Sequence, residues 1–254
     1  MEDAIMIILN GILTIIGDKS PNFYIYGSVA TDDFRLGWSD IDFVCLTEKS
    51  LDDIQTEKLL VLKNNLCEKY PDDKYLKLFE GVFMSVSAYE NGGRDKVVRW
   101  GTNGAEILDK YVPNSFELFE LAQDGVLVYG EDIRDIFKMP TFSQLKSDVK
   151  KHYDTIRKYA VNTSKSIYSF GWLLDISRCL YTLKYANVIA KTPAGEWALD
   201  NALCPDIQAL GAAVSVRLEP QLFSNPAVAE YSQRLGNAVQ EYCDVLEREL
   251  EKLN

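Results

Sequence analysis

The chain has 254 residues, of which 47% are hydrophobic and 26% are charged, and its formal net charge is −11. These values describe a globular protein long enough for one large domain or two small ones. The acidic balance argues against a nucleic-acid partner, which needs a basic surface, and suits a small cationic substrate.

Signals for membrane insertion, export or cross-linking are weak in this sequence. No apolar run approaches the roughly 20 residues that a membrane-spanning helix needs. The acidic start differs from the basic start of a secretory signal. The five cysteines are scattered and lack CxxC spacing, so we expect buried free thiols rather than disulfides or structural zinc. We therefore expect a cytoplasmic protein without a membrane partner.

The first 130 residues alternate predicted helices and short strands. Residues 3–16 carry apolar residues at helical spacing and predict a helix that ends at Gly17. Strands are predicted for residues 23–26, 41–46, 79–88 and 125–130. Residues 51–69 predict a second helix, with Ser50 as its N-cap and Pro71 beyond its end.

The pattern changes after Pro140, where strand signals disappear and long helical patterns begin. Helices are predicted for residues 142–160, 167–190 and 227–252. Before the last of them, Asn225 and Pro226 match a helix N-terminus. We therefore predict an α+β fold, with a small mixed sheet in residues 1–140 and an all-helical bundle in residues 141–254.

The most specific pattern lies at the first two predicted strands. Gly27 and Ser28 follow the first strand, and Asp40 and Asp42 lie at the start of the second. Side chains alternate faces along a strand, so these two carboxylates point the same way and repel each other unless a cation lies between them. Magnesium takes such ligands together with substrate phosphates. A glycine–serine turn offers a phosphate close backbone approach, a hydroxyl and an N–H. The pattern predicts nucleotidyl transfer.

Glu80 is a charged residue at the start of an otherwise apolar predicted strand. A carboxylate in such a strand is rarely buried unless it meets a cation or a substrate. We predict that Glu80 is a general base for an acceptor hydroxyl or a further metal ligand, with a place at the strand edge as the alternative. His152, the single histidine, lies in a lysine-rich helical stretch and is expected at the surface.

The segment YGSVATDDFRLGWSDIDFVCLT resembles the nucleotidyltransferase domain of the DNA polymerase β-type superfamily. Over nearly the whole chain, the sequence is similar to the aminoglycoside nucleotidyltransferases, in particular the streptomycin/spectinomycin adenylyltransferases. Residues 125–130 resemble the strand before the domain junction of that family. Residues 172–183, 189–192 and 196–199 resemble its helical domain.

This resemblance implies an antibiotic-resistance enzyme that transfers AMP from ATP to an aminoglycoside hydroxyl and releases pyrophosphate, with two Mg²⁺ ions as cofactors. It implies that Asp40 and Asp42 hold the metal and that Glu80 is the base or joins them as a ligand. The nucleotide-binding residues that it implies are Gly27, Ser28, Ser39, Arg178 and Lys191. A solvated helix face is the alternative for the last two.

Two other hypotheses keep the motif and change the function. The same chemistry can act on a hydroxyl of another small molecule or of a protein. A regulator can hold nucleotide without turnover, although three clustered carboxylates argue against that. We expect a monomer or weak dimer that binds ATP and a small cationic, hydroxylated substrate. Trp100 and Glu90 are candidates for the acceptor site, with core or rim as the alternative for Trp100.

Overall fold

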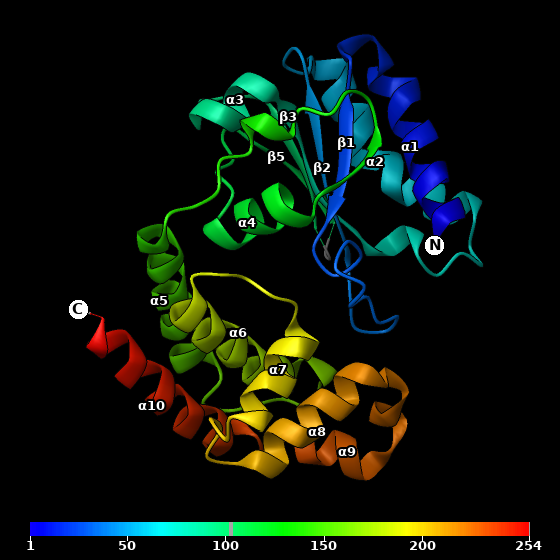
Figure 1. Cartoon of the computed structure of the whole chain (residues 1–254). Helices are drawn as coiled ribbons and strands as arrows, with labels where there is room; N and C mark the ends of the chain where they lie inside the picture. Colours follow the sequence, from blue (N-terminus) through cyan, green and yellow to red (C-terminus); the bar gives the residue numbers. More distant parts are fainter. Residues whose placement is uncertain (102–103, 254) are drawn as a thin grey trace. The chain divides into compact units, whose positions relative to one another are not determined.

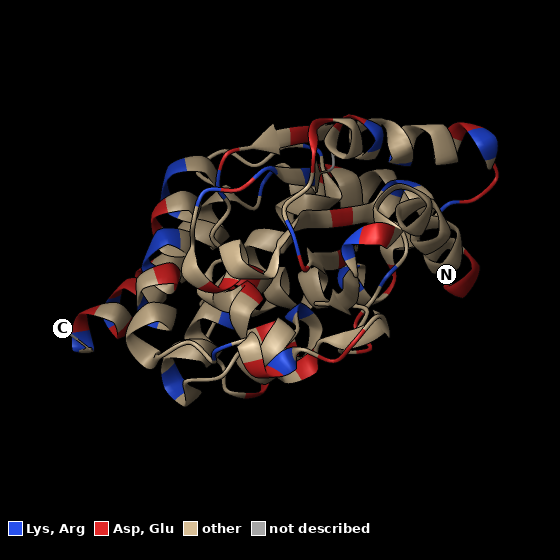
Figure 2. Ribbon diagram, turned by 90° about the horizontal axis from the view of Figure 1, so that it is seen from above, with Lys and Arg blue, Asp and Glu red and all other residues tan. Residues whose placement is uncertain are grey.

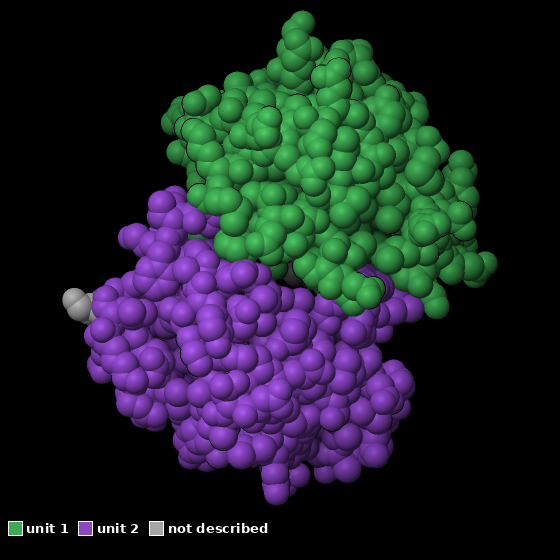
Figure 3. Space-filling view, viewed as in Figure 1, with its two compact units in different colours: residues 1–32, 40–139 green, residues 33–39, 140–254 purple. Residues whose placement is uncertain are grey.

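The computed structural model describes residues 1–101 and 104–253. The chain divides into two compact units, shown in Figure 3: residues 1–32 with 40–139 form the first, and residues 33–39 with 140–254 form the second. The predicted α+β class is confirmed, because strands lie in the first unit and the second is helical (Figure 1). Segment 33–39, which the sequence places in the first domain, belongs to the second unit.

The first unit is built on a mixed sheet of six strands in the order β5-β4-β3-β2-β1-β6. The strands are β1 (Asn22–Tyr26), β2 (Ile41–Thr47), β3 (Phe79–Ser85), β4 (Val97–Gly101), β5 (Gly104–Leu108) and β6 (Val126–Tyr129). Only β2 and β3 run parallel, and the other neighbouring pairs are antiparallel. The helices are α1 (Glu2–Ile16), α2 (Asp53–Lys69), α3 (Val86–Asn91) and α4 (Ser115–Asp124).

Helices cover both faces of this sheet (Figure 1). On the face toward α2, the Trp100 ring packs on Phe43 and Phe83, with ring centroids 5.4 and 4.9 Å apart, and its indole N–H donates to the Leu59 carbonyl at 2.9 Å. The other face is closed by α3 and α4 over a buried core that includes Tyr24, Val44, Val82, Tyr89 and Leu121. Both faces of the central strands are therefore buried, which explains their continuous apolar runs.

Several predicted boundaries in the first unit are wrong. The strand predicted for residues 79–88 ends at Ser85, whose side chain accepts from the Ala88 N–H and caps α3. The N-cap of α2 is Asp52 rather than Ser50, and Asp52 and Gln55 form a reciprocal capping box. Strands β4 and β5 and helix α4 have no counterpart among the predicted elements.

The second unit contains six α-helices within the described part of the chain. These are α5 (Phe142–Tyr159), α6 (Gly171–Tyr185), α7 (Lys191–Asp200), α8 (Ile207–Leu218), α9 (Pro226–Ser232) and α10 (Gly236–Lys252). The helix predicted for residues 167–190 ends at Tyr185, and the one predicted for residues 227–252 is broken between Ser232 and Gly236. Asn225 and Pro226 begin α9 as predicted.

Segment 33–39 is held inside the second unit by a buried ion pair. Asp33 and Arg217 have side chains that are only 4% and 3% exposed, and Arg217 Nη2 lies 3.2 Å from Asp33 Oδ2. The same oxygen accepts from the Thr192 N–H at the start of α7, also at 3.2 Å. The Arg217 guanidinium lies 5.4 Å from the centroid of Trp38. This short loop is therefore part of the helical core.

Charged residues of both signs occur along the whole chain. Asp and Glu outnumber Lys and Arg by 38 to 27, and Figure 2 shows both signs interspersed along the ribbon. No described helix has both the length and the apolarity that crossing a membrane requires.

Candidate active site

Tyr26, Asp42 and Glu80 form one row across three neighbouring strands. Their Cα atoms are register partners, Tyr26 with Asp42 on β1 and β2, and Asp42 with Glu80 on β2 and β3. Register partners project to the same face of a sheet, so the two carboxylates point to the same side. Asp40 directly precedes β2. The structure thus brings the two predicted carboxylates of separate strands together.

Asp42 lies in a strongly acidic environment. Its side chain is half-buried, and its pKa is raised to about 8 by burial and then by the charges of Glu120, Asp40, Glu80 and Glu117. Carboxylates gathered in this way are stable as anions only with a cation among them. Such a donor set fits a divalent metal ion.

No group of three or more His, Cys, Asp or Glu side chains within residues 1–101 and 104–253 is arranged as a metal site by itself. Magnesium commonly binds through one or two carboxylates and completes its shell with water and substrate phosphates. Asp40 and Asp42 fit that pattern, because a nucleotide would bring the remaining oxygens. The metal ligands therefore stay a prediction.

The turn after β1 brings the backbone next to Asp42. Gly27 has a φ of +65°, and a Cβ there would come within 2.5 Å of Asp42 Oδ2. The hydroxyl of Ser28, which is half-buried, donates to the Asp40 carbonyl at 3.5 Å. Ser39 is buried, and its hydroxyl accepts from the Arg35 N–H at 3.0 Å. Ser39 thus orders the loop in which it lies.

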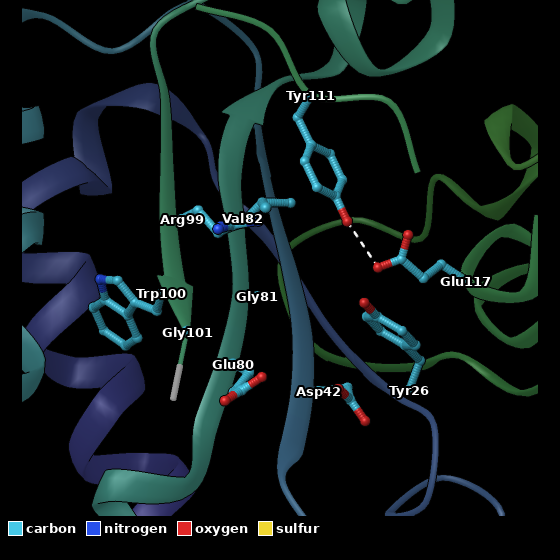
Figure 4. A pocket seen from close by; sticks show the side chains of 10 residues that line it. All are labelled: Tyr26, Asp42, Glu80, Gly81, Val82, Arg99, Trp100, Gly101, Tyr111 and Glu117. Atoms are coloured by element: carbon cyan, nitrogen blue, oxygen red, sulfur yellow. Dashed lines mark hydrogen bonds between the residues drawn. The ribbon is translucent and has the colours of Figure 1, made fainter. Parts of the chain in front are cut away.

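A cavity of about 330 Å³ opens beside this row of side chains (Figure 4). Its lining consists of Tyr26, Asp42, Glu80, Gly81, Val82, Arg99, Trp100, Gly101, Tyr111 and Glu117. Arg99 forms an ion pair with Glu106, its register partner on β5. The lining is therefore mainly acidic and phenolic, which suits a ligand with both cationic and hydroxyl groups.

The sequence analysis missed α4 and the residues that it contributes to this cavity. Glu117 Oε1 accepts from the Tyr111 hydroxyl at 2.8 Å, and its Oε2 accepts from the Asn114 N–H at 2.8 Å. Asn114 and Glu117 thus form a capping box at the start of α4. The spacing Asn-x-x-Glu is a helix-start signal that could have located this helix. Burial and the nearby acids raise the pKa of Tyr26 well above its ordinary value, so its phenol stays protonated.

Trp100 and Glu90, the two candidates for the acceptor site, and the buried Lys63 have other surroundings in the structure. Trp100 is 1% exposed and belongs to the core, although one edge of it lines the cavity. Glu90 is exposed and lines a different cavity, together with Glu48 and Glu131. Lys63 is buried and donates to the backbone carbonyls of β3 and β4 residues at 3.2 and 2.9 Å.

The second unit brings Arg178 and Lys191 together. Arg178 on α6 donates its Nε–H to the Ile189 carbonyl at 2.8 Å, and Lys191 Nζ lies 2.9 Å from Asp175 Oδ1. Burial alone raises the pKa of Asp175, but the charges of Lys191, Arg178 and His152 outweigh it and lower that pKa. His152 is exposed, as predicted from its lysine-rich surroundings. The two cations thus form a local basic cluster.

Comparisons with known proteins agree with this geometry. Residues 9–91 match the family model described as "Nucleotidyltransferase domain". A search of curated proteins gives no significant match to the sequence. Among solved structures, the chain is similar to spectinomycin adenyltransferase AAD(9) from Enterococcus faecialis, crystallised with ATP and spectinomycin. The sequence identity is 15% and the TM-score 0.65, over 94% of this chain and 99% of that one.

The resemblance drawn from the motif is confirmed by these two matches. At 15% identity the structural match speaks for the fold, while the family model covers both strands of the motif and Glu80. Residues 9–91 are therefore similar to a nucleotidyltransferase domain, within a chain whose fold is similar to that of the spectinomycin adenyltransferase.

Proposed function

We propose that this protein transfers AMP from ATP to a hydroxyl of a small cationic acceptor of the aminoglycoside type and releases pyrophosphate. The observation that carries the proposal is the register of Asp42 with Glu80 next to Asp40, inside a nucleotidyltransferase domain. Burial and the neighbouring carboxylates raise the pKa of Asp42 to about 8, which supports the proposal that a cation binds among them. Magnesium bound to Asp40 and Asp42 would supply charge stabilisation at the α-phosphate.

The proposed nucleotide-binding residues are the turn after β1 in the first unit and, in the second unit, the basic cluster of Arg178 and Lys191. Gly27 has no side chain, so a phosphate can approach the backbone there. The hydroxyls of Ser28 and Ser39 are further proposed hydrogen-bond donors to the nucleotide. Arg178 and Lys191 would bind the phosphates. An ammonium has three donors, so Lys191 can keep its Asp175 contact and still donate to a phosphate oxygen.

Glu80 would accept the proton of the acceptor hydroxyl. It lines the cavity and is half-buried, so an acceptor can reach it. A general base must lie within hydrogen-bond reach of the proton that it removes. Its other proposed role is a metal ligand, because it is the register partner of Asp42.

The acceptor class is supported by charge and by the structural neighbour. The net charge of −11 and the acidic cavity lining attract a polycation. The neighbour with the same fold was crystallised with ATP and spectinomycin. These observations favour an aminocyclitol or aminoglycoside acceptor.

The first test is pyrophosphate release from Mg-ATP with streptomycin, spectinomycin and kanamycin as acceptors. We expect release with at least one of them. Asp42→Asn should lose at least 100-fold in turnover, because a transition-state charge contact is worth several kcal/mol. Glu68→Gln, an exposed carboxylate of α2, should keep full turnover. An active Asp42→Asn protein would refute the metal assignment, and ATP binding without release for any acceptor would favour a non-catalytic nucleotide binder.

A second variant separates the two roles of Glu80. If Glu80 is the base, Glu80→Gln lowers turnover by about 10²- to 10⁴-fold while Mg-ATP affinity stays within twofold. Mg-ATP affinity is measured by calorimetry on the same protein sample. Loss of Mg-ATP binding together with turnover would show that Glu80 is a metal ligand and would refute its role as base alone.

A further inference from the structure

Helix α7 begins at Lys191 without a cap from its own stretch of sequence. The residue before it is Ala190, whose methyl side chain accepts no hydrogen bond. The first N–H groups of a helix need acceptors, and a serine or aspartate at the N-cap commonly supplies one. Here the Asp33 carboxylate does so, because its Oδ2 accepts from the Thr192 N–H at 3.2 Å. An aspartate 159 residues away in the sequence therefore caps α7.

Arg217 on α8 fixes this capping carboxylate. Its Nη2 donates to Asp33 Oδ2 at 3.2 Å and to the Asp33 backbone carbonyl at 2.9 Å. Both side chains are buried, so water does not compete for these hydrogen bonds. Because one bond reaches the backbone and the other the side chain, Arg217 sets the place and the direction of the aspartate together.

Stability alone is a poor explanation for this buried cluster. Asp33 Oδ1, Thr192 Oγ1 and Arg217 Nε are buried and have no hydrogen-bond partner among the described residues. Arg35 Nη2 lies 3.7 Å from Asp33 Oδ1, which is an ionic contact too long for a hydrogen bond. Buried polar atoms without such partners cost free energy, and apolar side chains in place of a buried ion pair often leave a protein as stable. A role in positioning α7 accounts for the pair better than stability does.

The residue next to the capped N–H is Lys191, which we have proposed as a phosphate ligand. Its Nζ lies 2.9 Å from Asp175 Oδ1 on α6, and Arg178 on the same helix donates to the Ile189 carbonyl at 2.8 Å. Helices α6 and α7 lie side by side within the second unit (Figure 1). The start of α7 is thus held by two contacts from α6 and by a third from Asp33.

We propose that Asp33, held by Arg217, is a positioning residue that keeps the Lys191 ammonium in place for the nucleotide phosphates. Segment 33–39 joins the proposed phosphate turn to the proposed metal ligands along the chain, so the same loop that links them also caps the helix of the lysine. Without the cap the first turn of α7 frays, and nucleotide binding must then order it again at a cost in affinity. This inference rests on the proposed function and adds residues that touch neither nucleotide nor metal.

The test is the affinity for Mg-ATP, measured by calorimetry on the full chain. Asp33→Ala removes the cap, Asp33→Asn keeps an oxygen that can accept from the Thr192 N–H, and Arg217→Ala releases the carboxylate. Lys191→Met, alone and combined with Asp33→Ala, reports whether the aspartate acts through the lysine. Leu246→Ala is the matched control, because it truncates a fully buried side chain on another helix of the same unit and lowers stability.

We expect Lys191→Met to weaken Mg-ATP binding by about tenfold or more, because a charge-assisted contact is lost. Asp33→Ala should weaken it by about tenfold and Arg217→Ala by a smaller factor, while Asp33→Asn should keep most of the affinity. In the Lys191→Met background, Asp33→Ala should change the affinity by less than about twofold. Leu246→Ala should stay within about twofold of the wild type although it unfolds at a lower temperature. If Asp33→Ala does not fold, Arg217→Ala with and without Lys191→Met gives the same comparison.

Four results would overturn the positioning role. They are wild-type affinity in folded Asp33→Ala or Arg217→Ala, a loss in Asp33→Asn as large as in Asp33→Ala, a full further loss on top of Lys191→Met, and an equal loss in Leu246→Ala. Unchanged affinity in Lys191→Met would refute the phosphate role of the lysine and the positioning role with it.

Pyrophosphate release, measured in parallel, separates this inference from the proposed function. Coupled losses of Mg-ATP affinity without release for any acceptor would refute the proposed transfer and retain the positioning role. Release that Lys191→Met impairs and Asp33→Ala leaves unchanged would retain the transfer and refute the positioning role.

Discussion

Gly27 has a second reason to be glycine besides the approach of a phosphate. Its φ of +65° lies in the left-handed region, and a Cβ would come within 2.5 Å of Asp42 Oδ2. A side chain at this position would therefore strain the turn and also push the Asp42 carboxylate out of its place. The conformation of the turn and the position of the Asp42 carboxylate therefore both require a residue without a side chain at position 27.

We expect Gly27→Ala to lower the free energy of unfolding by about 1–3 kcal/mol, the cost of left-handed backbone in a residue with a Cβ. Turnover should fall further than stability explains, because the methyl group displaces Asp42. Thermal unfolding and pyrophosphate release measure the two effects. Gly93→Ala is the control, since a Cβ there meets nothing within 4 Å. A fully active Gly27→Ala protein of unchanged stability would contradict this account.

At the residue scale, sequence reasoning succeeds where the determinants are local. Asp40 and Asp42 are two residues apart, and their alternation follows from the period of a strand. Glu80 is predicted as a site residue because it is a charged residue in an otherwise apolar strand. Glu117 and Tyr26 were missed because only the strand register and the packing of α4 bring them near Asp42. No pattern along the chain encodes that proximity.

At the element scale, boundaries failed where a side chain caps a helix inside an apolar stretch. Residues 79–88 look like one strand, but Ser85 ends it by capping α3. Strands β4 and β5 contain Arg99 and Glu106, which pair with each other and break the apolar pattern. The helical pattern at residues 227–252 continues through the break before Gly236, because buried residues lie on both sides of it, among them Ala229 and Val239.

Asp95 joins two of these elements. Its carboxylate accepts from the Ser85 N–H, where β3 ends, at 2.7 Å, and from the Lys96 N–H, before β4, at 2.9 Å. Burial by itself raises the pKa of Asp95, but these hydrogen bonds and one from Ser50 outweigh it, and the pKa lies below its ordinary value. A carboxyl whose pKa is lowered by folding stabilises the fold while it is ionised.

The contribution of Asp95 should therefore be complete above its unfolded pKa of about 3.9 and disappear as the pH falls through the lower folded pKa. Asp95→Asn should be less stable than the wild type at pH 7, and the gap should narrow below about pH 4. Urea unfolding at a series of pH values measures this gap. Asp72→Asn, an exposed loop carboxylate, should show no such gap. A gap that stays constant down to pH 3 would rule out the titration of Asp95 as its source.

At the scale of the whole molecule, the change from strand to helix patterns located the start of the long helical segment near residue 140. It could not locate segment 33–39, which lies between two strands of the nucleotidyltransferase motif and belongs to the helical unit. The tie is the ion pair between Asp33 and Arg217, 184 residues apart in the sequence. Contacts between residues so far apart leave no periodic pattern in the sequence. The predicted first domain, residues 1–140, therefore includes segment 33–39, which the structure assigns to the second unit.

This tie predicts a large coupling between two distant positions. Asp33→Ala should lower the free energy of unfolding by about 3–5 kcal/mol, because it leaves the buried Arg217 charge without its partner. Arg217→Ala should lower it by less, because Arg35 Nη2 still lies 3.7 Å from Asp33 Oδ1. The double variant should lose clearly less than the sum, since it leaves neither charge behind. Chemical unfolding of the full chain measures all three, with Arg248→Ala on the exposed side of α10 as a control expected within about 0.5 kcal/mol of the wild type. Additive losses would mean that the two residues stabilise the fold independently, and the helical unit would then not depend on the loop of the motif.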